Sequence, residues 1–474
     1  MRAVLLTALL LSGCLPSFPD DCGSGADCPT GRECIGGQCT LVTSGEAGTI
    51  DRGHDDGPDV DPDDGVAPGT ETCNGIDDDL DTVTDEGDAC RCVAVGAPVR
   101  FDTLGGPGRP DLVAGGVDLG VIWRAMHDDG GEAGPRPALF LATAPNGHTL
   151  LHVGEADATF DDPVLVATST SFIAAAIERR PDSSRVLVWS NPNAQPQTVE
   201  VDTPSPLALA PFATSANEAV LLYTARGGDG RRTLRAIIVT AGAERITEVA
   251  IGPAGLSYAE TPGPAIAPVG DRRVAVAVPV TDGDAGAALV HVGQLFANAQ
   301  GAPALALSPD TVAFDGPLAD LALTAGPTRT EPVVGRWLLL GGVIRGAQNW
   351  GTRVHRLFLG EGGAGFELGG EVVRTGVPAE TRLSIVSRGD SLLSFETGMV
   401  GDRVQVAAQI FSADAERRGP SWAIGELSTG AGAVRAVVRE DDVRVGWLVD
   451  PATPDIDSSG LFLRTVRCPV PDSP

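Results

Sequence analysis

The residues best suited to chemistry lie in one acidic stretch, CNGIDDDLDTVTDEGDAC, which begins at Cys73 and ends at Cys90. Calcium takes about six to eight oxygen ligands, and alternate aspartates on a tightly turned loop can supply them. The oxygens that fall at the ligand positions of an EF-hand-like run belong to Asp77, Asp79, Asp81, the carbonyl of Val83, Asp85 and Asp88. The spacing predicts a structural calcium site; the alternative is an acidic spacer that meets calcium only loosely.

The same stretch resembles the metal-binding motif of copper-repressible surface proteins of bacteria, the MopE type, which reads C-N-G-x-D-D-D-C-D-G-x-x-D-E-G. The residues that match it are Cys73, Asn74, Gly75, Asp77, Asp78, Asp79, Asp81, Asp85, Glu86 and Gly87. Leu80 stands where the family has a cysteine, and Thr82 stands where it has a glycine. The resemblance implies a structural metal in an exported protein.

Export is also indicated by the first residues, MRAVLLTALLLSGC, in which one arginine precedes a short apolar run. The run is too short to span a bilayer, which needs about 20 residues, and is typical of a secretory signal. Its end, LSGC, resembles the lipobox of bacterial lipoproteins. The resemblance implies a discarded leader over 1–13, a lipid on Cys14 and a tether over 14–21. The alternative is an ordinary signal peptide with an incidental cysteine.

Eight further cysteines fit an oxidising compartment, where disulfides persist. Four of them lie in 22–40, a segment with so few apolar residues that two disulfides must replace a core. Their pairing is open among three arrangements of Cys22, Cys28, Cys34 and Cys39. Residues 41–70 are dominated by Gly, Pro and Asp, and they are expected to form an extended, self-repelling linker before the acidic loop over 71–92.

The charge balance excludes one class of partner. The chain has 63 acidic and 34 basic residues, no lysine and a net charge of −29. Nucleic acid requires a basic surface, so it is not an expected partner. An acidic exterior favours solubility and divalent cations.

From residue 93 to residue 468 the sequence consists of short apolar runs separated by Gly, Asp, Pro and Ser turns. Residues 469–474 form a C-terminal tail. The runs group in fours, for example PLALAPF, EAVLLYTAR, TLRAIIVTA and RITEVAIG within 206–251. Seven such units of roughly 50 residues predict an all-β fold, a seven-bladed β-propeller. The alternative is another multi-sheet β repeat.

The last unit has three strands, and the strand-like run VGAPVRFDTL (95–104) is its expected fourth. This closure would bring Cys92 beside Cys468 and predicts a disulfide between them. Cys73 then pairs with Cys90 by elimination. If all disulfides were instead local, Cys468 would stay free and an odd thiol would remain among the cysteines of 73–92.

No motif for nucleophilic, phosphate or zinc chemistry is evident in the sequence. Most tryptophans sit within strand runs and are expected to pack between blades. The fifth unit is longer than the others, and an inserted loop is expected around Gly346–Gly351. Trp350 in this loop is the one residue singled out as a possible ligand contact.

The expected protein is a monomeric lipoprotein of the bacterial envelope, anchored through its lipid in the outer membrane on the periplasmic face or the cell surface. Its propeller is expected to bind or scaffold an envelope protein or polysaccharide. A propeller enzyme, a hydrolase or lyase of carbohydrate, is the first alternative. A purely structural surface component is the second. Fold alone does not name the ligand.

Overall fold

The computed structural model describes residues 32–35, 38–41, Cys73 and 90–469, the last range with internal gaps. The gaps are 102–109, 116–117, 132–133, 145–146, 170, 213–216, 244–245, 254, 271, 282–287, 299–300, 330–334, 346–349, 361–365, 378–380, 389–390, 401–402, 412–416, 428–433, 440–441 and 450–459. The chain divides into two compact units, 1–65 and 66–474. No helix in the described part is long and apolar enough to cross a bilayer.

In the first unit, β1 (Arg32–Ile35) and β2 (Gln38–Leu41) form an antiparallel hairpin. Its register places Cys34 directly opposite Cys39. The predicted lipid site Cys14 and the cysteines Cys22 and Cys28 lie outside the described residues.

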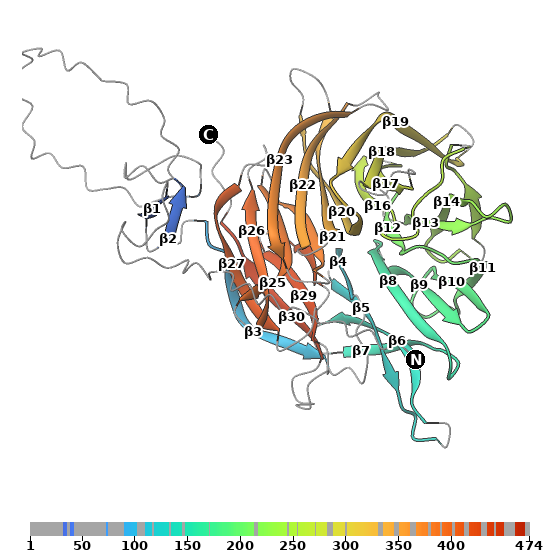
Figure 1. The fold of residues 1–474 in the computed structure, drawn as a ribbon. Helices are drawn as coiled ribbons and strands as arrows, with labels where there is room; N and C mark the ends of the chain where they lie inside the picture. Colours follow the sequence, from blue (N-terminus) through green and yellow to red (C-terminus); the bar gives the residue numbers. More distant parts are fainter. Residues whose placement is uncertain are drawn as a thin grey trace, which may run out of the picture. The chain divides into compact units, whose positions relative to one another are not determined.

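The second unit is a ring of seven four-stranded antiparallel sheets, as predicted (Figure 1). Blades 1 to 3 follow the chain from the inner strand outwards. Blade 1 consists of β4 (Asp111–Gly115), β5 (Asp118–His127), β6 (Arg136–Ala144) and β7 (Gly147–Val153). Blade 2 consists of β8 (Thr159–Ala167), β9 (Phe172–Arg180), β10 (Ser183–Trp189) and β11 (Gln197–Val201). Blade 3 consists of β12 (Ala208–Pro211), β13 (Glu218–Arg226), β14 (Arg232–Thr240) and β15 (Thr247–Ala250).

Blades 4 to 6 repeat the pattern, and blade 7 takes its outer strand from the start of the unit. Blade 4 consists of β16 (Ala265–Gly270), β17 (Arg273–Val280), β18 (Ala288–Ala297) and β19 (Pro303–Phe314), and blade 5 of β20 (Leu318–Arg329), β21 (Gly335–Arg345), β22 (Trp350–Gly360) and β23 (Phe366–Val377). Blade 6 consists of β24 (Leu383–Arg388), β25 (Ser391–Val400), β26 (Arg403–Phe411) and β27 (Arg417–Leu427). Blade 7 consists of β28 (Val434–Arg439), β29 (Asp442–Val449), β30 (Gly460–Arg467) and β3 (Val93–Phe101).

The inner strands close the ring. Each of β4, β8, β12, β16, β20 and β24 contacts the next inner strand, and β28 contacts β4. One apolar cluster fills each seam between neighbouring blades. Central strands are therefore buried on both faces, which is why β9 (FIAAAIERR) and β13 (EAVLLYTAR) read as continuous apolar runs.

The closing blade confirms the predicted use of the run after Cys92 as its fourth strand. β3 pairs antiparallel with β30, with Val93 opposite Arg467 and Phe101 opposite Leu461. The structure contains the Cys92–Cys468 disulfide, which joins residues 376 apart, and the Cys73–Cys90 disulfide. All four cysteines are buried in the apolar cluster between blades 6 and 7.

The fifth unit corrects one prediction. Trp350 and Gly351 do not lie in an inserted loop, because β22 begins at Trp350 and pairs it with Arg345 of β21. The unit is long because its strands are long, at 12, 11, 11 and 12 residues, against 9, 9, 7 and 5 in blade 2. Backbone pairing continues to the turn, so the extra residues extend the sheet.

Candidate functional site

The two faces of the ring differ in what they carry. In every blade the inner strand starts at one face, where the connectors from the preceding outer strand and the turns between second and third strands also lie. We call this the connector face; in blades 2 and 3 it carries residues 202–207 and 251–264. The opposite face, where β30 ends at Arg467 and β3 begins at Val93, is the tether face.

Two arginines from neighbouring blades meet one carboxylate at the connector face. Arg124 of β5 donates from Nη1 to the Phe160 carbonyl at 2.7 Å and to Asp161 Oδ1 at 3.1 Å. Arg179 of β9 donates from Nε to Asp161 Oδ2 at 2.6 Å. Asp161 at the start of β8 therefore ties blade 1 to blade 2. All three side chains remain about one-third exposed.

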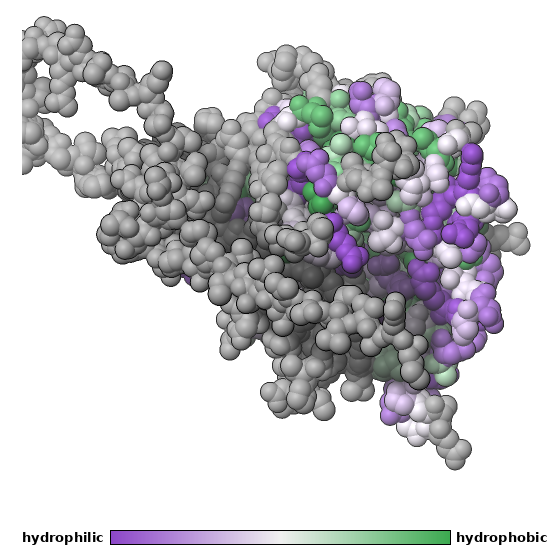
Figure 2. All heavy atoms as spheres, viewed as in Figure 1, coloured by the Kyte–Doolittle hydropathy of each residue, from purple (hydrophilic) through white to green (hydrophobic). Residues whose placement is uncertain are grey.

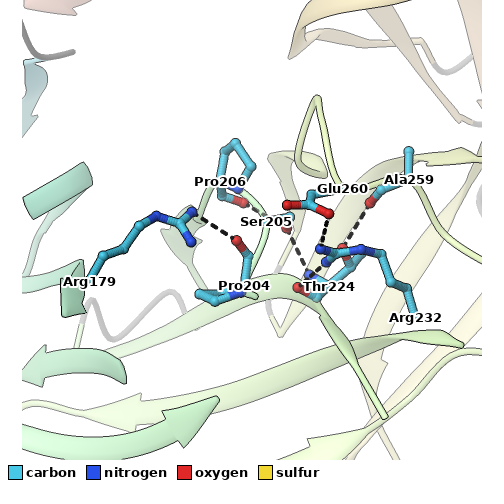
Figure 3. Close-up of polar contacts among 8 residues, drawn as sticks. All are labelled: Arg179, Pro204, Ser205, Pro206, Thr224, Arg232, Ala259 and Glu260. Atoms are coloured by element: carbon cyan, nitrogen blue, oxygen red, sulfur yellow. Dashed lines mark hydrogen bonds and ion pairs between the residues drawn. The ribbon is translucent and has the colours of Figure 1, made fainter. Parts of the chain in front are cut away.

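The contacts continue into the connector between blades 2 and 3 (Figure 3). Arg179 Nη2 donates to the Pro204 carbonyl at 3.2 Å. The next residue, Ser205, exchanges two hydrogen bonds with Thr224: each backbone N–H donates at 2.8 Å, one to the Thr224 carbonyl and one to Ser205 Oγ. The connector is thus fixed to blade 2 through Arg179 and to blade 3 through Thr224.

The connector between blades 3 and 4 is held in the same manner. Thr224 Oγ1 donates to the Ala259 carbonyl at 2.9 Å. Arg232 Nη2 lies 2.5 Å from Glu260 Oε2, a close ion pair, while its Nη1 reaches the Thr224 carbonyl at 3.4 Å (Figure 3). Arg232 is buried, whereas Glu260 is half exposed.

The two connectors touch each other. A Cβ at Gly263 would lie 2.2 Å from the Pro206 carbonyl oxygen, so only glycine fits there. Thr203, just before Pro204, has a φ of 43°, a left-handed conformation that costs roughly 1–2 kcal/mol in a residue with a Cβ. Strain of this kind persists where the surroundings determine the backbone, as the paired contacts of Pro204 and Ser205 do here.

A second polar group lies between blades 1 and 2. Glu178 of β9 is fully buried and accepts from Arg185 Nε, while Arg180 Nη2 lies 3.5 Å away and also pairs with Glu155. Burial lowers the pKa of nearby His152, an effect opposed by the charge of Glu178 and reinforced by Arg185 and Arg180. The His152 ring packs edge-on against Phe160 and Trp189.

The outer surface near these contacts is polar. In Figure 2, hydrophilic residues gather over the strands of blades 2 and 3. The turn residues Asp182, Asp229 and Arg231 of these blades are exposed at the connector face. Within the described residues, no three His, Cys, Asp or Glu side chains gather as a metal site would require. The contacts of Arg179, Thr224 and Arg232 hold the two connectors in place at this face.

The predicted site residues fall into three groups. The calcium ligands Asp77, Asp79, Asp81, Val83, Asp85 and Asp88 lie outside the described residues, so this site stays a prediction. Cys73, Cys90, Cys92 and Cys468 form the two disulfides already described. Trp350 is half-buried at the connector-face end of β22, packs at the edge of the seam between blades 5 and 6, and has the Arg345 guanidinium 5.9 Å from its ring centroid.

Sequence reasoning missed the arginines that hold the connectors. Arg179 and Arg232 both flank the turn between the second and third strands of their units, in IERRPDSS and TARGGDGRR. An arginine beside this turn in consecutive units was a usable signal. Its partners were not, since Arg179 reaches the Pro204 carbonyl, 25 residues away, only through the packing of a connector. Likewise Asp161 meets Arg124, 37 residues away, only through the stacking of two sheets.

Comparisons with known proteins identify no relative: no family model and no curated protein matches the chain. Solved structures match at low identity. An ulvan lyase of polysaccharide lyase family PL25 is 10% identical over 79% of this chain and 95% of its own, with a TM-score of 0.44. The Nup133 β-propeller domain of Vanderwaltozyma polyspora is 9% identical over 75% and 99%, with a TM-score of 0.37.

A third match is the subtype N11 neuraminidase-like protein of A/flat-faced bat/Peru/033/2010, which is 8% identical over 81% of this chain and 95% of its own, with a TM-score of 0.39. None of these likenesses identifies a function for this chain, and the propeller assignment rests on its own sheet order.

Proposed function

We propose that this chain is an exported, lipid-anchored protein whose propeller binds a partner at the cell envelope through its connector face. The observation that carries the proposal is topological. Both ends of the propeller chain, at Cys92 and Cys468, lie at the tether face. The chain therefore enters and leaves the propeller at the tether face, and neither junction lies at the connector face.

The contacts within the connector face support binding. Arg179, Arg232 and Thr224 hold the two connectors to the sheets below, and the connectors touch at Gly263. A surface ordered before binding loses little conformational entropy on association, which favours affinity. The half-buried Trp350 and the exposed Asp182 and Asp229 are among the side chains that this surface presents to a ligand.

The other parts of the proposal come from the sequence alone. They are the lipid on Cys14, an outer-membrane location, a structural calcium on the loop that follows Cys73, and a monomeric state. The partner is an envelope protein or polysaccharide. These parts do not depend on which of the two the propeller binds.

The test uses the full chain immobilised through its N-terminal segment. Binding is measured by interferometry against a panel of purified envelope polysaccharides, peptidoglycan fragments and outer-membrane proteins, and each polysaccharide is also assayed for newly released chain ends. The connector face is probed with Asp182→Trp, a turn residue of blade 2. The matched control is Asn193→Trp, an exposed turn residue of the same blade at the tether face.

The expected result is saturable binding of at least one probe, weakened about tenfold or more by Asp182→Trp and unchanged by Asn193→Trp. Cleavage of a bound polysaccharide would replace the proposal with the enzyme alternative. Equal loss in both variants would show that the connector face is not the binding surface. The absence of binding across the panel would favour a purely structural component.

A further inference from the structure

The closing strand β3 joins the propeller to the chain before it, and seven of its nine residues are exposed. Val93, Val95 and Val99 are 56%, 40% and 36% exposed, and only the last residue, Phe101, is buried. Figure 1 shows β3 along the outside of blade 7, beside β30. Packing therefore contributes little to its retention.

Its backbone pairing is also interrupted. The register with β30 shifts between Val95 and Val99. Gly96 in this interval has a φ of 73°, and Pro98 has no N–H to donate. An antiparallel strand pulled from one end opens its hydrogen bonds one after another, so a strand with an interrupted ladder yields readily to a pull on its first residue.

β3 is held firmly at its two ends. At the connector face, the Phe101 ring packs 5.4 Å from the Trp123 ring of blade 1, centroid to centroid. At the tether face, Cys92 stands immediately before the strand and is bonded to Cys468 immediately after β30. This covalent bond lies at the end where a pull from the preceding chain would begin to open the pair.

We propose that the two disulfides act in series as a covalent load path from the N-terminal segment into the ring. A pull on Cys73 passes through its disulfide to Cys90, along the backbone of Arg91 to Cys92, and through the second disulfide to Cys468 and β30. The path bypasses both the acidic loop over 74–89 and the strand β3. It does not depend on which ligand the propeller binds.

The surroundings of the path anchor it to two blades. All four cysteines lie in the seam with Leu393 and Phe395 of blade 6 and Val443 and Val466 of blade 7. The buried Arg388 of blade 6 donates to the Cys468 carbonyl, and the Arg91 guanidinium lies 5.1 Å from the Trp422 ring centroid of the same blade. A load that reaches Cys468 is thus shared between two sheets.

The test is single-molecule pulling of the full chain between its N-terminus and a handle at Asp229, an exposed turn residue of blade 3. In the oxidised protein the ring is expected to unfold without an earlier step. In Cys92→Ser/Cys468→Ser, detachment of the nine residues of β3 is expected first, as a low-force step of at least roughly 30 Å. The matched control, Cys73→Ser/Cys90→Ser, is expected to add roughly 60 Å of slack without that step.

An early step of the same size in the oxidised protein would overturn the proposal, because the bond would then not carry the load. The absence of this step in Cys92→Ser/Cys468→Ser would also overturn the proposal, because backbone pairing with β30 and the packing of Phe101 would then be enough to hold β3 in place. If that variant fails to fold, dithiothreitol is added to tethered, folded Cys73→Ser/Cys90→Ser. The early step must then appear on reduction; its failure to appear contradicts the proposal.

Discussion

The seam between blades 6 and 7 and the seams that join blades 1 to 4 differ in the bonds that lie beside their apolar filling. The first contains two disulfides within an apolar cluster. In the others, Arg124, Arg179 and Arg232 reach carboxylates and connector carbonyls at the connector face. The apolar filling between the sheets is alike in both regions.

The difference follows from chain connectivity. Blades 1 to 4 are each built from consecutive strands, so short turns bring their strands together at small entropic cost. Blade 7 joins strands from opposite ends of the ring, and Cys92 and Cys468 are 376 residues apart. A covalent bond is placed where loop-closure entropy is largest, and polar contacts suffice where it is small.

Removal of the Cys92–Cys468 disulfide is expected to change stability more than any other test of this comparison. Cys92→Ser/Cys468→Ser is expected to lose about 6 kcal/mol of unfolding free energy, the chain-entropy estimate for a loop of this length. The Cys73–Cys90 disulfide closes a far shorter loop, so Cys73→Ser/Cys90→Ser is expected to lose about 3 kcal/mol of unfolding free energy. Denaturant unfolding without reductant measures both. Equal losses would show that the closing bond has no special weight.

The close contact between connectors is the next most sensitive point. Gly263→Ala forces a methyl group into the Pro206 carbonyl and is expected to cost about 2 kcal/mol, as overpacking does. Gly270→Ala is the control, since nothing lies within 4 Å of a Cβ there. Thermal unfolding of the two variants compares them. A harmless Gly263→Ala would mean that the connectors can separate without loss.

Removing one arginine from the seams with polar contacts is expected to have a smaller effect on stability. Arg179→Gln loses the Asp161 ion pair and the Pro204 contact, and because the group is one-third exposed we expect a cost of about 1 kcal/mol. Arg231→Gln, at an exposed turn of blade 3, is expected to stay within about 0.5 kcal/mol of the parent. Chemical denaturation resolves the difference. A neutral Arg179→Gln would show that the contacts of this arginine with Asp161 and Pro204 do not stabilise the fold.

The smallest expected effect is a pH dependence at the seam between blades 1 and 2. Burial lowers the pKa of His152 below its ordinary value of 6.5, against the opposing charge of Glu178 and with the help of Arg185 and Arg180. The folded state therefore favours the neutral ring. Its contribution to stability is complete above the unfolded pKa and is lost as the pH falls from 6.5 towards the folded pKa.

His152→Phe removes this titration and should flatten the fall in unfolding free energy between about pH 7 and about pH 5. Urea denaturation of the parent and the variant across this range provides the measurement. Parallel pH profiles for the two proteins would show that the fall arises from other groups.

The sequence by itself determined the seven four-stranded units, the strand that closes the ring and the pairing of Cys92 with Cys468. These follow from short-range patterns, namely apolar runs between turn residues, and from counting: one unit lacked a strand and one cysteine lay alone near the end. Each inference required only the order of residues along the chain.

Only the tertiary structure decided which side chains meet across the seams. Arg124 of blade 1 contacts Asp161 of blade 2 because two sheets stack in a fixed register. Arg179 reaches the Pro204 carbonyl because the connector packs against its blade, and no local pattern encodes either contact. Trp350 was misplaced for the same reason: the turn-like sequence WGTR (350–353) became strand because β21 and β23 were available to pair with it. Backbone pairing and side-chain reach depend on neighbours that folding supplies, and the chain order alone does not specify them.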